Sequence, residues 1–318
     1  MIAVILVGGE GTRLRPLTLD RPKAMLPIAG RPFLAHMLDR LATAGVKRVI
    51  FSCGYLPDPI VAGFGDLYDG MTLEYAVEPA PMDTAGAIRF AIEGRLDDGP
   101  FFALNGDVLM EAPLEDLMAF HITRGARATV TLTEVPDPTR YGLVIADRDG
   151  LVEAFVEKPE PGAAVTLTPP YWINAGAYVL DRWFLAAVPA MERVNIEREV
   201  FPLLVGNGLY AWRCTGYWND IGTPESYLAA NMHLADGDTV LGAGASVGEG
   251  ATVDRSVVHE DAVIGAGAVV TDSVIGRGAR IGARAHVSNG SIVAAGVEIA
   301  DDRSVTGEKV FPEAPDGT

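Results

Sequence analysis

Hydrophobic and polar residues alternate in two different patterns along the chain, and the change falls near residue 235. Before it, short apolar runs are separated by stretches in which apolar residues recur every three or four positions, as Phe33, Met37 and Leu41 do. Such runs predict strands, and such stretches predict helices. Strands are expected at residues 2–7, 49–52, 73–77, 101–104 and 128–135, and helices at about 33–44, from about 84 and at 114–123. This β-α-β order predicts a mostly parallel, three-layer α/β sheet, whose ligands bind beyond the carboxyl ends of the strands.

From residue 239 the apolar positions recur every five or six residues, with glycine and other small residues between them. The aliphatic positions are Leu241, Val247, Val253, Val258, Ile264, Val270, Ile275, Ile281, Val287, Val293 and Ile299. This hexapeptide repeat predicts a parallel β-helix, in which three steps, or about 17 residues, make one coil. The open coil end and the flat sides are edges that need covering, so we expect a homo-oligomer. The predicted organisation is an α/β domain over residues 1–235, a β-helix over 239–307 and a disordered tail over 308–318.

Composition narrows the class of protein. The 318 residues carry a net charge of −17, which argues against nucleic acid or an anionic membrane as a general partner. The chain has no run of eighteen apolar residues, so no membrane span is expected, and because the first predicted strand begins at residue 2 we expect no signal peptide. The two cysteines, Cys53 and Cys214, lie in apolar contexts and are expected to be reduced core residues of a cytoplasmic protein.

A glycine-rich turn, Gly8-Gly9-Glu10-Gly11, follows the first predicted strand. Four cations come next within eleven residues: Arg13, Arg15, Arg21 and Lys23. Glycines let the backbone approach an anion closely, and the local excess of positive charge in an acidic chain favours a polyphosphate site. The alternative is a tight turn with solvated arginines. A dinucleotide fingerprint would need a third glycine where Leu14 stands, and a P-loop would need Gly-Lys-Ser/Thr.

The run Gly8-Gly9-x-Gly11-Thr12-Arg13-Leu14-x-Pro16-Leu17-Thr18, with Pro22-Lys23 after it, resembles the signature of sugar-1-phosphate nucleotidylyltransferases. One departure is Ala24, where that family often has a second proline. The resemblance implies a Rossmann-like three-layer nucleotidyltransferase domain with a mostly parallel sheet, followed by a left-handed parallel β-helix. It also implies that a sugar 1-phosphate attacks the α-phosphate of a nucleoside triphosphate and releases pyrophosphate.

The same resemblance assigns the nucleotide side of the site. The nucleotide-binding residues are expected to be Leu6, Gly8, Gly9, Gly11, Thr12, Arg13, Glu78, Thr84, Ala85 and Gly86, and the catalytic residues Arg13, Lys23 and Asp107. The expected cofactor is Mg²⁺, held by Asp107 of the Asn105-Gly106-Asp107 turn and by Asp220. Magnesium prefers one or two carboxylates together with phosphate oxygens. The alternative for Asp107 is a simple turn residue, and for Asp220 a helix cap, although Thr223 suits that cap better.

The sugar side of the site follows from three further matches. The sugar phosphate is expected at Gly142, Glu157, Lys158 and Asn174, which stand in Tyr-Gly, Glu-Lys-Pro and Asn-Ala-Gly motifs. By the resemblance, Glu157 accepts hydrogen bonds from sugar hydroxyls, Lys158 holds the phosphate and Asn174 binds hydroxyls.

Glu78 bears on the choice of base. A carboxylate only accepts hydrogen bonds, and guanine offers two adjacent donors, so Glu78 favours GTP over other triphosphates. The alternative is that Glu78 caps the following helix or faces water. Thr84-Ala85-Gly86 and the segment 196–202 also resemble mannose-1-phosphate guanylyltransferases most, whereas Asp83 is unexpected near a triphosphate.

Four hypotheses remain open. The first is a magnesium-dependent enzyme that makes GDP-mannose from GTP and mannose 1-phosphate. The second is a nucleotidylyltransferase for another base or sugar, such as a glucose-1-phosphate thymidylyltransferase. The third is a catalytically silent regulatory subunit that binds nucleotide sugar, although the phosphate and metal groups are all present. The fourth is acyl transfer by the β-helix at His259 or His286, which as isolated histidines are expected at the surface.

Overall fold

The computed structural model describes residues 1–54, 57–160 and 169–312, and it divides into two compact units. The first unit comprises Met1–Gly8 and Met37–Trp218, and the second comprises Gly9–His36 and Asn219–Thr318. Helix α1 (Phe33–Thr43) and strand β14 (Trp218–Asp220) each span a boundary between the two units. The chain therefore passes between units within the glycine-rich turn, between Gly8 and Gly9.

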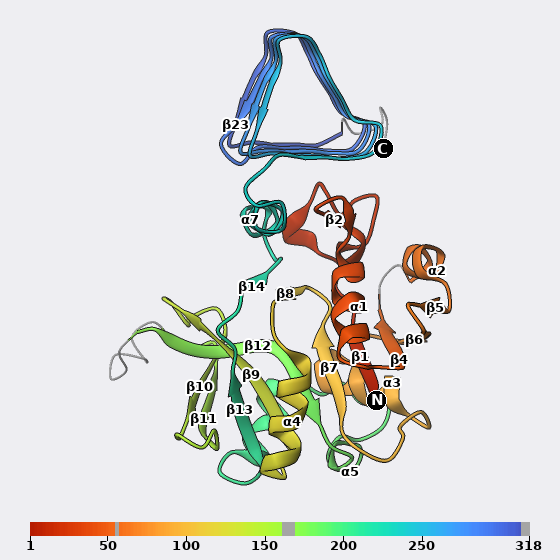
Figure 1. Ribbon diagram of the computed structural model, residues 1–318, viewed down its shortest axis with the longest axis vertical. Helices are drawn as coiled ribbons and strands as arrows, with labels where there is room; N and C mark the ends of the chain where they lie inside the picture. The colour runs from red at the N-terminus through yellow and green to blue at the C-terminus, as the bar shows by residue number, and fades with distance from the viewer. Residues whose placement is uncertain (55–56, 161–168, 313–318) are drawn as a thin grey trace. The chain divides into compact units, whose positions relative to one another are not determined.

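A twisted sheet forms the centre of the first unit (Figure 1). Its parallel part has the order β7-β1-β4-β6, formed by β7 (Phe101–Asn105), β1 (Ile2–Leu6), β4 (Arg48–Cys53) and β6 (Met71–Val77). Antiparallel neighbours extend it on the β7 side: β12 (Tyr171–Leu180), β9 (Ala128–Val135), β10 (Gly142–Ala146) and β11 (Val152–Glu157). The strands expected before residue 136 are confirmed, and the α/β fold class is confirmed with them.

Short elements complete this unit. The strands are β5 (Leu67–Tyr68), β8 (Val108–Met110) and β13 (Leu209–Arg213), and the helices are α2 (Asp58–Phe64), α3 (Asp83–Ile92), α4 (Leu114–Arg124), α5 (Trp183–Ala187), the π-helical turn η3 (Ile196–Val200) and α6 (Phe201–Leu204). The core is aliphatic and aromatic, with Tyr178, Phe101 and Phe201 among its fully buried side chains. Cys53 and Cys214 are buried free thiols, as expected, and burial raises the pKa of Cys53 to about 12.

The second unit contains the expected β-helix, drawn in blue in Figure 1, whose three flat sheets enclose a triangular section. The sheet orders are β15-β18-β21-β24-β27, β16-β19-β22-β25 and β17-β20-β23-β26, and all pairs are parallel. The strands are β15 (Val240–Leu241), β16 (Ser246–Val247), β17 (Thr252–Asp254), β18 (Val257–Val258), β19 (Val263–Ile264), β20 (Val269–Thr271), β21 (Val274–Ile275), β22 (Arg280–Ile281), β23 (His286–Ser288), β24 (Ile292–Val293), β25 (Glu298–Ile299), β26 (Ser304–Thr306) and β27 (Lys309–Val310).

The repeat positions line the interior of the β-helix. Val258, Ile264 and Val270 are almost wholly buried, whereas Leu241 and Val247 are 50% and 41% exposed because no earlier coil covers the first one. Val257 pairs with Val274, so one coil takes 17 residues, as the spacing predicts. The β-helix fold is thus confirmed.

The predicted tail begins too early. β27 (Lys309–Val310) pairs in register with β24, so the β-helix continues into the segment that was expected to be disordered from residue 308. The spacing itself continues into this coil, since Val305 and Val310 follow Ile299 at steps of six and five residues, but the predicted repeat was ended at residue 307. Residues 313–318 of that expected tail lie outside the described residues.

The rest of the second unit packs against one side of the β-helix. It holds the 3₁₀ turns η1 (Thr12–Leu14) and η2 (Lys23–Met25), the hairpin β2 (Pro27–Ile28) and β3 (Arg31–Pro32), and helix α7 (Pro224–Leu234). Tyr227 of α7 is fully buried, and its hydroxyl donates to the carbonyl of Pro27 and contacts His259 Nε2 at 2.9 Å. The expectation that His259 lies at the surface is therefore wrong, because α7 covers it, whereas His286 is exposed.

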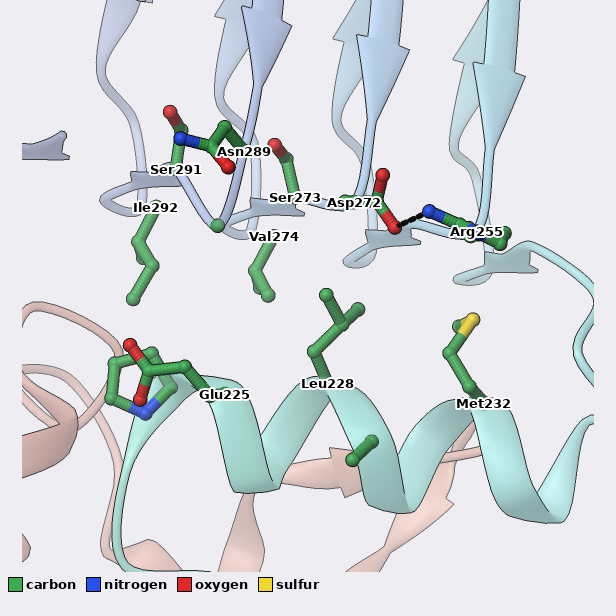
Figure 2. Close-up of a pocket in the computed structure, with 13 residues that line it drawn as sticks. Glu225, Leu228, Met232, Arg255, Asp272, Ser273, Val274, Asn289, Ser291 and Ile292 are labelled. Atoms are coloured by element: carbon green, nitrogen blue, oxygen red, sulfur yellow. Dashed lines mark hydrogen bonds and ion pairs between the residues drawn. The ribbon is translucent and has the colours of Figure 1, made fainter. Parts of the chain in front are cut away.

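Between α7 and the first sheet of the β-helix lies a pocket of about 410 Å³ (Figure 2). Leu228 and Met232 point into it from α7, and Val274 and Ile292 from the β-helix. None of the residues predicted for the site lines this pocket. Among the described residues, no helix has the length and apolar character needed to cross a membrane.

Candidate active site

The candidate site in the first unit begins where β1 and β7 end side by side. Leu6 pairs with Asn105, so the start of the glycine-rich turn and the Asn105-Gly106-Asp107 turn leave the sheet at the same edge, as the topology predicts. The Gly106 N–H donates to the Leu6 carbonyl at 2.9 Å. A Cβ at Gly106 would lie only 2.5 Å from that oxygen, so only glycine allows this approach. The half-buried Asp107 follows directly.

Gly8 lies at the same edge, beside the end of β4. A Cβ built at Gly8 would lie 3.4 Å from the Gly54 nitrogen and 3.7 Å from Glu78 Oε1. Glu78 Oε1 accepts a hydrogen bond from Ser52 Oγ at 3.1 Å, and its Oε2 accepts one from the N–H of Met82, the N-cap residue of α3, at 3.1 Å. Glu78 therefore caps the following helix, which was the alternative interpretation, and it does so within reach of the glycine turn.

Thr84, Ala85 and Gly86 form the first turn of α3, and their polar groups face the segment 192–197. The N–H groups of Ala85 and Gly86 both donate to the Val194 carbonyl, at 2.9 and 3.1 Å. A Cβ at Gly86 would lie 2.3 Å from the Glu192 carbonyl, so this glycine is needed for close packing. In this structure the first turn of α3 therefore donates its hydrogen bonds to residue 194 of the same chain.

Asp83 is explained by the same segment. Its backbone is left-handed, with φ of 58°, and its Oδ1 accepts hydrogen bonds from the Thr84 N–H at 2.8 Å and from Asn195 Nδ2 at 2.9 Å. Arg193 Nε lies 3.7 Å from Asp83 Oδ2. The carboxylate that looked misplaced beside a triphosphate therefore anchors residues 193–195 to the start of α3.

The sugar-side residues gather on β10, β11 and β12. Gly142 pairs with Glu157, and a Cβ at Gly142 would lie 3.0 Å from Glu157 Oε2. Lys158 Nζ lies 3.6 Å from Glu157 Oε1. On β12, Asn174 Oδ1 accepts from the Gly176 N–H at 3.0 Å, and its Nδ2 donates to the Tyr178 hydroxyl at 2.9 Å.

Two aromatic side chains lie beside this group. The rings of Tyr141 and Trp218 meet edge to face, with centroids 5.4 Å apart, and Trp218 Nε1 donates to the Ala175 carbonyl at 3.0 Å. Ala175 belongs to the Asn174-Ala175-Gly176 motif, so Trp218 fixes the strand that carries Asn174.

Sequence reasoning assigned no role to a buried hydrogen-bond chain that links the two sides. The Tyr178 hydroxyl donates to Glu197 Oε1 at 3.3 Å, and Glu197 Oε2 accepts from Thr84 Oγ1 at 3.1 Å. With the Asn174 amide, the chain runs from a predicted sugar-binding residue to a predicted nucleotide-binding residue. A register shift in β12 between Asn174 and Tyr178 allows their side chains to meet. The segment 196–202 stood out in the sequence by its family resemblance, but the sequence did not indicate which residues would bind Glu197.

Burial governs the charges along this chain. Burial raises the pKa of Glu197, and the negative charge of Glu157 raises it further. Burial also raises the pKa of Tyr178 well above its usual value, and the charge of Glu197 adds to this effect. Tyr178 therefore stays a neutral donor toward Glu197.

In the second unit, the glycine turn continues into a cation-bearing loop. Gly11 has a left-handed φ of 62°, and its carbonyl accepts from the Leu14 N–H at 3.0 Å and from Thr18 Oγ1 at 2.9 Å. A Cβ at Gly11 would lie 3.1 Å from Lys23 Cβ. The loop therefore places the stem of Lys23 beside Gly11.

Arg13 and Asp220 lie at the same glycine. A Cβ at Gly222 would be 2.8 Å from Arg13 Nη2 and 3.1 Å from Asp220 Oδ1. Thr223 caps α7 by accepting from the Ser226 N–H at 3.3 Å, as expected, so the cap does not require Asp220. A predicted catalytic cation and a predicted metal-binding carboxylate thus both lie beside Gly222.

Two of the four predicted phosphate-site cations are bound to carboxylates instead. Arg21 makes a two-bond pair with Glu260 of the β-helix, at 3.3 Å for each bond, and Arg15 Nη2 lies 3.6 Å from Glu10 Oε2. Arg21, one of the four cations expected at a polyphosphate site, is thus paired in this structure with a carboxylate of the β-helix.

The donor set suits magnesium. Among the residues that the structure describes, no group of three or more His, Cys, Asp or Glu side chains is arranged to hold a metal ion. Magnesium needs only one or two carboxylates when substrate phosphates supply the other oxygens, and hard oxygen ligands are what Asp107 and Asp220 offer.

Comparison with known proteins places these features in a family context. A family model described as "Nucleotidyl transferase" matches residues 2–237, and one described as "GMPPB C-terminal domain" matches residues 227–314. A mannose-1-phosphate guanylyltransferase of Mycobacterium tuberculosis is 38% identical over 292 residues, covering 81% of this chain and 79% of that protein. A mannose-1-phosphate guanyltransferase of Debaryomyces hansenii is 38% identical over 238 residues, covering 73% of this chain and 64% of that protein.

Solved structures show the same fold. The crystal structure of HddC from Yersinia pseudotuberculosis matches with a TM-score of 0.62 and 29% identity, covering 73% of this chain and 99% of that chain. A second crystal structure of HddC, complexed with GMP-PN, matches with a TM-score of 0.60 over the same coverage.

Proposed function

The chain belongs to the nucleotidyl transferase family, and we propose that it joins GTP to mannose 1-phosphate, giving GDP-mannose and pyrophosphate. The observation that carries this proposal is the 38% identity to a mannose-1-phosphate guanylyltransferase over 79% of that protein's length. HddC, crystallised with the guanine nucleotide analogue GMP-PN, supports the choice of base.

The reaction is a displacement at phosphorus. An oxygen of mannose 1-phosphate forms a bond to the α-phosphorus of GTP, the bond from that phosphorus to the bridging oxygen breaks, and pyrophosphate leaves with the electron pair. The attacking oxygen is already ionised at neutral pH, so the protein need not remove a proton. Its main tasks are to position two polyanions and to stabilise the charge that develops between them.

The glycine turn and its cations suit the triphosphate. The backbone N–H groups around Gly8, Gly9 and Gly11 would hold the phosphate oxygens, and a Cβ at Gly9 would meet nothing within 4 Å, so its backbone is open to a ligand. Arg13 would neutralise the charge of the leaving pyrophosphate, and Lys23 that of the α-phosphate.

Asp107 and Asp220 are the residues that would hold Mg²⁺. When bound, the ion supplies positive charge that offsets the repulsion between the two phosphorylated substrates. Asp107 follows the end of β7, Asp220 is the last residue of β14, and both side chains are half-buried.

On the sugar side, Glu157 and Asn174 would accept and donate hydrogen bonds to hydroxyls, and Lys158 would hold the phosphate. Tyr178 and Glu197 keep Asn174 in one orientation from behind. Such preorganisation limits the entropy that must be lost on binding the sugar.

Glu78 can still read guanine while it caps α3. Each of its oxygens accepts one hydrogen bond in this structure and retains a second lone pair. Guanine would place its N1–H and 2-amino donors on those lone pairs, whereas uracil and thymine would present an acceptor on each side of their single donor.

The test is a pyrophosphate-release panel with Mg²⁺. It crosses GTP, ATP, UTP, dTTP and CTP with the 1-phosphates of mannose, glucose, galactose, glucosamine and fucose. We expect GTP with mannose 1-phosphate to give the highest kcat/KM. A maximum with dTTP and glucose 1-phosphate would support the thymidylyltransferase alternative, and binding of nucleotide sugar without turnover would support the silent subunit. Thiol release from acetyl-CoA would support acyl transfer instead.

We also propose that the chain forms a homo-oligomer through its β-helix. The exposed aliphatic side chains of the first coil, Leu241 and Val247, support this proposal, because an open coil end is otherwise left uncovered. Light scattering of the purified protein would test it, and a monomer at micromolar concentration would contradict it.

A further inference from the structure

The last strand of the β-helix contacts the loop that carries the predicted catalytic arginine. Lys309 lies on β27, and its Nζ donates a hydrogen bond to the backbone carbonyl of Arg13 at 3.0 Å, across 296 residues of sequence. The neighbours of Lys309 are held in the coil, since the Ile292 N–H donates to the Glu308 carbonyl at 2.8 Å and the Ala294 N–H to the Val310 carbonyl at 3.0 Å. The lysine stem therefore projects from a fixed backbone.

Two other coils of the β-helix hold the same loop. Arg277 Nη2 donates to Asp20 Oδ2 at 3.0 Å, and Glu260 accepts two bonds from Arg21 at 3.3 Å each. Both contacts lie after residue 19, at the far end of the loop from the glycine turn. Among the contacts described, Lys309 is the one through which the β-helix reaches residue 13 itself.

A restraint on the Arg13 carbonyl should affect the position of the Arg13 guanidinium. Arg13 is the middle residue of η1, and its guanidinium lies at Gly222 beside the Asp220 carboxylate. Fixing the backbone of Arg13 restricts where its guanidinium can go. Because effective catalysis needs charged groups placed to within a fraction of an ångström, a loosened η1 would lower the rate.

The surroundings of Lys309 also hold it in place. The pKa of Glu225 is lowered by a hydrogen bond from its own backbone N–H and by one from Thr223, and the nearby positive charge of Lys309 contributes to the same shift. Glu225 lies in the first turn of α7, where Figure 2 shows it at one end of the pocket. The ammonium group of Lys309 is thus attracted by the Arg13 carbonyl, to which it donates, and by the negative charge of Glu225.

We propose that Lys309 is a positioning residue for nucleotidyl transfer: from the final coil of the β-helix it fixes the backbone of Arg13 and, through it, the guanidinium that faces the phosphates. The inference rests on the proposed function of Arg13. It gives the β-helix a part in the reaction besides assembly. A single exposed hydrogen bond adds little to the stability of a fold, so we expect the effect in the rate and in local motion and not in the melting temperature.

The experiment compares Lys309→Met, which removes the charge and the donor but keeps the stem, with Lys309→Arg, which restores both. Lys47→Met is the matched control, because Lys47 is an exposed lysine of the first unit with no predicted role. Amide hydrogen exchange of residues 12–17 is measured in the full-length protein without substrate, and kcat and KM for GTP are measured by pyrophosphate release.

For Lys309→Met we expect exchange over residues 12–17 to accelerate at least threefold and kcat to fall about tenfold, with a melting temperature within about 1 °C of the wild-type value. Lys309→Arg should recover kcat to within about threefold, and Lys47→Met should change neither readout. Unchanged exchange, or a kcat within twofold of wild type, would overturn the inference.

Failure of the proposed function would give results that differ from failure of the positioning role of Lys309. If the wild-type protein preferred another triphosphate, the assignment of GTP would fall, and the same variants would be compared with the preferred substrate. If the wild-type protein turned over no substrate pair, the proposed function and the positioning role would both be rejected, while the exchange data would still show whether Lys309 restrains the loop.

Discussion

Gly106→Ala tests whether close contact between β1 and the Asn-Gly-Asp turn positions the metal-binding carboxylate. The added methyl group would lie 2.5 Å from the Leu6 carbonyl and 2.8 Å from Val7 Cγ1. To relieve the first contact to between 3.0 and 3.4 Å, the two backbones must separate by about 0.5–0.9 Å. That movement also lengthens the hydrogen bond from the Gly106 N–H to the Leu6 carbonyl, now 2.9 Å.

The magnitude follows from this displacement. Overpacking of this kind costs about 1–3 kcal/mol of stability, which leaves a protein of ordinary stability folded. Asp107 is the next residue and must move with the turn. A shift approaching 1 Å in a positioned group lowers the rate by up to about a hundredfold, so we expect kcat to fall between about tenfold and a hundredfold.

The assay is pyrophosphate release at saturating Mg²⁺, together with thermal unfolding followed by circular dichroism. Gly9→Ala is the matched control for stability, because the same methyl group at Gly9 meets nothing within 4 Å and its melting temperature should not change. A Gly106→Ala protein with kcat within twofold of wild type would refute the reasoning, since the turn would then tolerate the displacement without moving Asp107 out of position.

Three further predictions concern other parts of the molecule. Tyr178→Phe removes a hydroxyl that accepts from Asn174 and donates to Glu197, and we expect a loss of about 1–3 kcal/mol in urea unfolding and a raised KM for the sugar phosphate. Burial lowers the pKa of His121 to about 4, so the unfolded chain binds its proton first as the pH falls. Stability should therefore decrease between about pH 6.5 and pH 4, by up to about 3 kcal/mol, and His121→Asn should flatten this slope. Asp107→Asn should abolish turnover with its unfolding curve unchanged, and chelation of Mg²⁺ should stop the wild-type reaction until the ion is restored.

Each of these predictions has a contradicting result. A Tyr178→Phe protein as stable as wild type would mean that Asn174 and Glu197 find other partners. If the stability of His121→Asn decreased as steeply as that of the wild type between about pH 6.5 and pH 4, groups other than His121 would be responsible for the decrease. Near-normal activity of Asp107→Asn, or turnover in excess chelator, would contradict the metal assignment, and Asp116→Asn on the surface of α4 serves as its matched control.

Much of the fold could be predicted because its signals are local. A strand buried on both faces needs an unbroken apolar run, as at Ile2–Leu6, and each coil of the β-helix needs an aliphatic residue at each step. The glycine turn was visible for the same reason, since its backbone conformation depends on the residues themselves. The last coil at Lys309–Val310 keeps the same spacing, and it was missed because the predicted repeat was ended at residue 307.

The contacts of the candidate site were harder to predict because they join distant parts of the chain. The residues around Arg21 do not predict that it pairs with Glu260, and those around Glu197 do not predict its hydrogen bond with Tyr178. The motif positions were recognisable, but the partner of each charge was not. A motif carries the residue types that a reaction needs, whereas the partners depend on which strands and coils pack together.

By itself, then, the sequence determined the two architectures, the order of the strands along the chain and the residue types available for binding phosphate and metal, since each depends on spacing within a few residues. Only the tertiary structure decided that Glu78 caps α3, that Arg21 is neutralised by a β-helix carboxylate and that Lys309 reaches the carbonyl of Arg13. These contacts join residues that are far apart in sequence and are brought together only by packing. Each one contributes about 1 kcal/mol of net stability, which does not constrain the residues next to it in the chain.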